Sequence, residues 1–163
     1  MTARQYERWS APFRGKGAGR ALNLFNRAAT GLCYAAYPVA LLGLLLRRDE
    51  RGIPALLVPA VSFLLVSVFR SRYNAPRPYE VLKIEPLIHK NTRGHSFPSR
   101  HVFSMFVIVM TFLWLWPPLG AIFLLLGALL AVCRVVGGVH FPRDVLAGAA
   151  MGVAAGLCYW MFW

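Results

Sequence analysis

Five apolar runs, each long enough to cross a membrane as a helix, constrain this chain more than any other feature of its sequence. They cover residues 28–46, 53–69, 99–116, 119–136 and 142–163. A helix needs about 20 apolar residues to cross the hydrocarbon core of a bilayer. Hydrophobic residues make up 58 % of the 163 residues and charged residues only 15 %, so a soluble fold would lack the polar surface to cover them. The sequence therefore predicts a single-domain, all-α integral membrane protein, with about five transmembrane helices in a compact bundle.

The first 27 residues form a basic segment without a long apolar run. Leu22, Leu24 and Phe25 lie between Arg20 and Arg27, a pattern that predicts a short helix at the membrane interface. The net charge of +12 has two explanations, which apply to different residues: cations at the interface with anionic lipid, and cations that hold a phosphate. No nucleic acid partner is expected, because no basic stretch alternates with aromatic residues on a soluble face.

An odd number of spans divides the polar segments unequally between the two sides of the membrane. Five spans place the N-terminus, the 70–98 loop and the turn before the last span on one face. The opposite face keeps residues 47–52, the pair Pro117 and Pro118, and the C-terminus. Six Lys and Arg in residues 1–27 against three in 47–52 favour the cytoplasmic side for the N-terminal face. We therefore expect a multi-pass protein of a bacterial cell membrane with its polar chemistry on the cytoplasmic face.

Three clusters of polar residues lie on that face. The first is Arg70, then Arg77 and Pro78; the second is Pro98, Ser99, Arg100 and His101; the third is Arg134, His140 and Asp144. Pro98 and Pro142 each suit the first turn of a helix, where free backbone N–H groups favour an anion. Arginine side chains next to such helix ends favour phosphate as the bound anion.

The third cluster contains a candidate nucleophile. Pro142 places His140 just before a helix and Asp144 in its first turn, so the carboxylate is expected to accept a hydrogen bond from one imidazole nitrogen. Such a bond orients the ring and stabilises positive charge on it during nucleophilic attack. His101, at the start of another helix, is placed to protonate a leaving oxygen.

In order and spacing, the three clusters resemble the signature of the type-2 phosphatidic acid phosphatases, a superfamily that includes bacterial acid phosphatases and vanadium haloperoxidases. The resemblance covers residues 70–148. It implies a membrane lipid phosphate or diphosphate phosphohydrolase that forms a phosphohistidine, acting on phosphatidate-type or polyprenyl (di)phosphate lipids. It implies no metal and no other cofactor, because arginines supply the charge stabilisation.

The resemblance also implies a role for each site residue. His140 is the nucleophile, Asp144 its hydrogen-bond partner and His101 the general acid. The residues that bind phosphoryl oxygens are Arg70, Arg77, Ser99 and Arg134, with Arg100 added to them. Arg100 stands where the family usually has glycine, so its guanidinium either reaches a second phosphate or headgroup, or extends to the interface. Cys133 replaces a common serine, and the chain has five spans where membrane relatives often have six.

Two other functions remain open on the residues alone. The same arginines suit a scaffold or transporter component that binds anionic lipid without turnover. Alternatively, His101, His140 and Asp144 are the ligands of a metal-dependent hydrolase. Lys83, Lys90 and Arg93 in the 70–98 loop are placed to attract an anionic substrate in either case.

The last span carries a stripe of small residues. Gly148, Gly152 and Gly156 follow His140 and Asp144 at intervals of four residues, so they lie along one helix face. Glycines at this spacing let a neighbouring helix approach closely. We expect an intramolecular contact that holds the catalytic end of this helix still; a homodimer face is the alternative.

Overall fold

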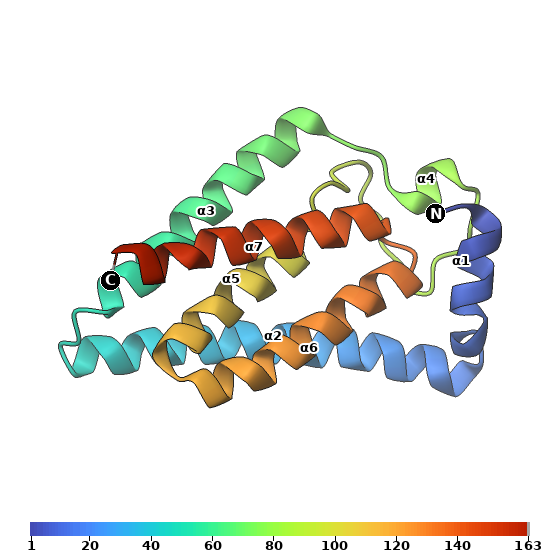
Figure 1. The fold of residues 1–163 in the computed structure, drawn as a ribbon. Coiled ribbons are helices and arrows are strands. Elements are labelled where there is room, and N and C mark those ends of the chain that lie inside the picture. Colours follow the sequence, from blue (N-terminus) through green and yellow to red (C-terminus); the bar gives the residue numbers. More distant parts are fainter. Residues whose placement is uncertain (163) are drawn as a thin grey trace.

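The chain is an all-helical bundle, shown in Figure 1 as a computed structural model that describes residues 1–162. Its long helices are α2 (Lys16–Leu46), α3 (Gly52–Tyr73), α5 (Arg100–Leu115), α6 (Pro117–Val136) and α7 (Pro142–Phe162). The short ones are α1 (Ala3–Ser10), the 3₁₀ turn η1 (Ala11–Phe13) and α4 (Pro78–Val81). The predicted fold class is confirmed. Trp163, the predicted end of the last span, lies outside the described residues.

Helix α5 forms the centre of the bundle. It packs most extensively against α7 and α6, and also contacts α2 and α3. Phe103, Val109 and Phe112 on α5 are buried in the main hydrophobic core. Among helices of the described chain, α2, α3, α6 and α7 are long and apolar enough to cross a membrane, whereas α5 has 16 residues. A helix that is apolar all round belongs in the interior, and α5 occupies that position.

The N-terminal segment differs from its prediction. Residues 20–27 do not form a separate interfacial helix, because α2 begins at Lys16 and continues through them to Leu46. Leu22, expected to face the interface, is buried with Ile88 and Val139. The apolar side of this stretch packs onto the loops around the site, and so it extends the first span. The short amphipathic element of the segment is α1, further upstream.

The glycine stripe of α7 is a contact within the chain. Gly148, Gly152 and Gly156 are buried against α5. A Cβ atom on Gly148 would lie 2.6 Å from the carbonyl oxygen of Ser99, and one on Gly152 would lie 2.8 Å from that of Phe103. The two backbones therefore approach as closely as only glycine permits. The expected contact within the chain is therefore found, and α5 covers the helix face on which the alternative placed a homodimer.

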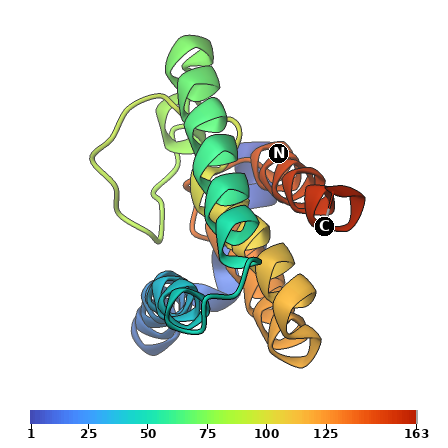
Figure 2. The ribbon, with the colours of Figure 1, turned by 90° about the vertical axis from the view of Figure 1, so that its left-hand side faces the viewer.

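The polar segments gather at one end of the bundle. Figure 1 shows α1, α4 and the turn between α6 and α7 at the same end, with residues 47–51, the α5–α6 junction and the C-terminal end of α7 at the other. The α4–α5 loop (residues 82–99) belongs to the first end. In the end-on view of Figure 2 this loop lies on the opposite side of α3 from α7. The predicted gathering of the three clusters on one face is thus found.

Candidate active site

The turn between α6 and α7 positions His140. The backbone N–H groups of Val139 and His140 both donate to the carbonyl of Arg134, at 3.2 and 3.3 Å. Gly138 has a φ angle of +76°, a conformation that glycine adopts without strain. The buried ring of Tyr6 on α1 lies directly against this glycine. His140 is 1 % exposed, so the turn holds the imidazole within the protein.

A serine joins His140 and Asp144. Nδ1 of His140 lies 3.7 Å from Oδ2 of Asp144, which is longer than a direct hydrogen bond. The hydroxyl of Ser96 donates to the same Oδ2 at 2.5 Å and lies 3.4 Å from Nδ1 of His140. The N–H of Phe141 also donates to Oδ2, at 2.9 Å. The expected direct bond is therefore replaced by a three-residue arrangement that directs Nδ1 toward the carboxylate and leaves Nε2 for another partner.

Burial controls the charge of His140. Burial lowers the pKa of this imidazole, and the nearby guanidinium groups of Arg134 and Arg77 lower it further, while Asp144 acts in the opposite direction. A neutral imidazole has a free nitrogen lone pair, as a nucleophile requires.

Arg134 and Ser99 have buried polar atoms without a hydrogen-bond partner among the residues that the structure describes. Nη1 of Arg134 donates to Oδ1 of Asn26 at 3.2 Å, whereas its Nε and Nη2 are buried without a hydrogen bond, as is Oγ of Ser99. Buried polar atoms are nearly always paired, and guanidinium groups pair best with carboxylates and phosphates. These donors therefore indicate a binding site for an anion.

Arg70 and Arg77 join the α4–α5 loop to the rest of the site. Arg77 donates to the carbonyls of Gly94 and Val139 at 3.0 and 3.1 Å. Arg70 donates to the carbonyls of Pro98 and His95. Both side chains are buried. These two guanidinium groups thus hold backbone segments together at the place where the sequence predicts phosphate contacts.

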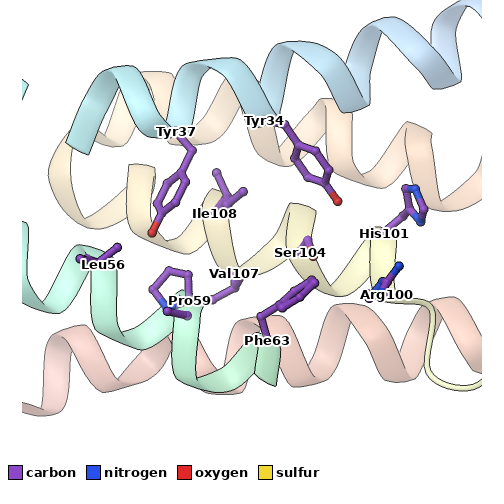
Figure 3. Close-up of a pocket in the computed structure, with 11 residues that line it drawn as sticks. Tyr34, Tyr37, Leu56, Pro59, Phe63, Arg100, His101, Ser104, Val107 and Ile108 are labelled. Carbon is purple, nitrogen blue, oxygen red and sulfur yellow. The ribbon is translucent and has the colours of Figure 1, made fainter. Parts of the chain in front are cut away.

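His101 and Arg100 lie at one end of an apolar cavity of about 430 Å³ between α2, α3 and α5. Figure 3 shows Tyr34 and Tyr37 along one wall, with Tyr37 far from the two basic residues. The guanidinium carbon of Arg100 lies 5.6 Å from the ring centroid of Phe63. The cavity is therefore apolar over most of its length and reaches the polar end of the bundle at Arg100 and His101.

A second, basic cavity of about 260 Å³ lies between the end of α3 and the α4–α5 loop. Arg70, Arg77, Lys90 and Arg100 contribute to its lining. Burial lowers the pKa of Lys90 to about 8, and the four guanidinium groups of Arg77, Arg134, Arg70 and Arg100 act in the same direction. Lys90 therefore faces the arginine cluster.

Three contributors to the site were not foreseen. Ser96, Asn26 and Tyr6 act through their contacts to Asp144, Arg134 and the Gly138 turn. Only Asn26 had a signal in the sequence that could have identified it, because it is a polar residue beside an apolar run.

The start of α5 also differs from its prediction. Ser99 is the N-cap and Arg100 the first helical residue, so Pro98 precedes the helix instead of lying in its first turn. Pro142 begins α7 as predicted.

The alternative hypothesis of a metal-dependent hydrolase places a metal ion on His101, His140 and Asp144. Within residues 1–162, no group of three or more His, Cys, Asp or Glu side chains is arranged to hold a metal ion.

Fold and site together define a multi-pass membrane protein with a histidine and arginine site at one end of its helix bundle. Residues 51–163 match the PAP2 superfamily, and the chain belongs to this superfamily. It is 29 % identical over 109 residues to the bacitracin transport permease protein BcrC of Bacillus licheniformis, covering 67 % of this chain and 53 % of that one. It is also 29 % identical over 125 residues to an undecaprenyl-diphosphatase of Sulfolobus acidocaldarius, covering 73 % and 59 %. The chain thus spans little more than half the length of these relatives.

Two crystal structures share the fold. LpxE of Aquifex aeolicus superposes with a TM-score of 0.76 at 25 % identity, over 99 % of this chain and 95 % of that one. A transmembrane PAP2-type phosphatidylglycerolphosphate phosphatase of Bacillus subtilis superposes with a TM-score of 0.57 at 23 % identity, over 96 % and 91 %. The first similarity extends over nearly the whole bundle, including α1 and α2, which precede the matched family region.

Proposed function

We propose that this protein hydrolyses a lipid phosphate or diphosphate at the membrane interface through a phosphohistidine on His140. One observation carries the proposal: a buried imidazole directed by Ser96 and Asp144 lies in a site with a guanidinium group that has unpaired donors. Membership of the PAP2 superfamily supports it. So do the names of the relatives, which include an undecaprenyl-diphosphatase and a phosphatidylglycerolphosphate phosphatase.

In the first step Nε2 of His140 attacks the phosphorus atom. Nδ1 keeps its proton, which faces Ser96 and Asp144, so positive charge that develops on the ring is stabilised by the carboxylate. Nε and Nη2 of Arg134 and the hydroxyl of Ser99, unpaired in the described structure, bind the phosphoryl oxygens. Donors fixed in advance stabilise the charge that develops in the transition state.

His101 is the general acid of the first step and the general base of the second. As the bond from phosphorus to the lipid oxygen breaks, His101 gives a proton to the leaving oxygen. The neutral His101 then accepts a proton from water, which attacks the phosphohistidine and releases phosphate with His140 restored. His101 lies at the end of the apolar cavity, the side from which a lipid leaving group would depart.

The apolar cavity is the proposed site of the lipid chain. A volume of about 430 Å³ is within the range of ligand pockets, and its lining residues come mostly from the apolar helices α2, α3 and α5. A phosphatidate-type or polyprenyl chain would remain in this apolar environment while its phosphate reaches the cations at the polar end.

On the same proposal the site faces the cytoplasm in a bacterial cell membrane. Residues 1–27 carry six Lys and Arg and lie at the site end, whereas residues 47–52 carry three. Labelling of a cysteine introduced at Gly15 with a membrane-impermeant maleimide tests the orientation. Protection in intact cells and labelling after lysis support the proposal; labelling of intact cells places the site outside.

The function is tested by phosphate release from lipid monophosphates and diphosphates, in detergent with excess chelator, by the wild type and His140→Ala. Release by the wild type, reduced roughly a thousandfold or more in an equally folded variant, supports the nucleophile. If neither protein releases phosphate, the lipid-binding scaffold is favoured. Loss of wild-type activity with chelator favours the metal-dependent hydrolase, and an active variant excludes His140 as the nucleophile.

A further inference from the structure

Arg100 lines both cavities of the site. Together with His101 it lies at the end of the apolar cavity, and together with Lys90 it lines the basic cavity. The two spaces therefore adjoin at Arg100. A lipid whose chain occupies the apolar cavity has its head group beside this guanidinium.

The site holds more positive charge than one phosphate needs. Four cationic side chains line the basic cavity, and Arg134 lies close enough to Lys90 to affect its charge. A phosphate monoester carries roughly −1.5 to −2 charges near pH 7. Asp144 is engaged by Ser96 and by the N–H of Phe141, and Glu80, which accepts from the N–H groups of Arg77 and Gly94, adds one negative charge, so one monoester still leaves net positive charge in the site. A substrate with a second anionic group would balance them better.

The loop holds Lys90 at this place from both sides. Before it, the N–H of Ile88 donates to the carbonyl of Gly137 at 3.1 Å. After it, the N–H of Gly94 donates to the carboxylate of Glu80 at 2.9 Å. The backbone that carries Lys90 is thus anchored two residues before it and four residues after it. Anchoring the segment that carries a cation reduces the entropy lost when the anion binds.

We propose that Lys90 and Arg100 form a second anion subsite beside the phosphate-binding residues, which holds the inner phosphate of a lipid diphosphate. This inference rests on the proposed function. The outer phosphorus is attacked by Nε2 of His140, and its bond to the bridging oxygen breaks. The leaving group is the lipid monophosphate, whose bridging oxygen keeps the electron pair of the broken bond and accepts the proton of His101. Lys90 and Arg100 stabilise that developing charge, so they raise the rate for diphosphates above that for monophosphates.

The test compares a polyprenyl diphosphate with the monophosphate of the same chain, in Lys90→Gln and Arg100→Gln. We expect kcat/KM to fall about tenfold or more for the diphosphate, the range of a lost charge-assisted contact, and much less for the monophosphate. The control is Arg72→Gln, an exposed cation outside both cavities, which leaves both rates unchanged. Equal losses on the two substrates overturn the inference while the proposed function stands.

A binding measurement separates failure of the inference from failure of the proposed function. Inorganic diphosphate is expected to raise the melting temperature of the detergent-solubilised protein more than phosphate does, and this preference is lost in both variants. If the wild type hydrolyses no lipid but keeps the preference, the proposed function fails and the subsite stands. If the wild type has no preference, or the variants retain it, the subsite does not exist.

Discussion

The hydroxyl of Ser96 donates a 2.5 Å hydrogen bond to Oδ2 of Asp144. The two residues come from different parts of the chain, Ser96 from the α4–α5 loop and Asp144 from the first turn of α7. The N–H of Ser99 also donates to the backbone carbonyl of Asp144, at 2.8 Å. The end of this loop and the start of α7 are therefore joined at the point where His140 is oriented.

Removing that hydroxyl with Ser96→Ala is expected to lower kcat about 10- to 100-fold, because a hydrogen bond to a charged group contributes about 1.5–3 kcal/mol. KM should change little, since no phosphate-binding donor is removed. Steady-state kinetics over a range of pH measure the effect, and the acidic limb of the profile should move as the imidazole loses its orientation.

The matched control is Ser62→Ala on α3, whose hydroxyl donates only to the carbonyls of Val58 and Pro59 within its own helix. It should keep wild-type kcat. A Ser96 variant with unchanged kcat and pH profile would mean that His140 and Asp144 need no intermediary.

The fold and the motif residues were predictable from sequence because both depend on local patterns. Apolar runs define spans by length, and three clusters at fixed spacing are brought to one face by the alternation of those spans. Contacts between distant segments were not predictable in this way. The contact of Asn26 with Arg134 joins residues 108 positions apart, and no periodicity in the sequence encodes it.

The same reasoning explains the error at the N-terminus. Composition identified residues 20–27 as interfacial because arginines flank the apolar group. In the structure Leu22 packs on Val139, next to the nucleophile, so the helix continues without a break. The role of a residue such as Tyr6, whose hydroxyl bonds to the backbone at Glu85 and Leu87, likewise depends on the folded loop that it contacts.

Gly138→Ala tests the packing of α1 beneath the catalytic turn. A Cβ atom at this position would lie 2.9 Å from the hydroxyl oxygen of Tyr6, and the φ angle of +76° disfavours any residue with a side chain by about 1 kcal/mol. We expect a lower melting temperature and a reduced kcat, because His140 follows two residues later. Thermal unfolding in detergent and phosphate release measure the two effects.

Gly31→Ala is the control for this change, since a Cβ atom there meets nothing within 4 Å and alanine favours a helix by up to about 1 kcal/mol. It should be neutral or stabilising. If Gly138→Ala behaves like Gly31→Ala, the turn tolerates displacement and its contact with Tyr6 does not position the nucleophile.

Asn26→Leu tests how Arg134 is held. The guanidinium donates to Oδ1 of Asn26 at 3.2 Å, and removing this acceptor leaves another buried donor unpaired, at a cost of about 1–3 kcal/mol. Because Arg134 becomes less well oriented toward the phosphoryl oxygens, we expect KM to rise and kcat to fall by about tenfold together. Adding phosphate should stabilise the variant less than the wild type in thermal unfolding.

The matched control is Thr30→Val, one turn further along α2. It also replaces a polar side chain with an apolar one, but the Thr30 hydroxyl donates only to the backbone carbonyl of Asn26. It should preserve both kinetic constants. Wild-type kinetics in Asn26→Leu would show that Arg134 is positioned by its helix alone.

Lys90 is expected to make kcat/KM for a lipid diphosphate depend on pH in the alkaline range. Burial and the surrounding arginines lower the pKa of Lys90 to about 8, so the side chain is charged below that pH and neutral above it. Arg70 from α3, Arg77 before α4, Arg100 from α5 and Arg134 from α6 keep their charge over this range. As pH rises through about 8, kcat/KM for a lipid diphosphate should therefore fall. Lys90→Arg, which stays protonated, should move the decline to higher pH, whereas Lys90→Gln should show a low, flat profile there. A decline that stays at the same pH in Lys90→Arg would assign it to another group.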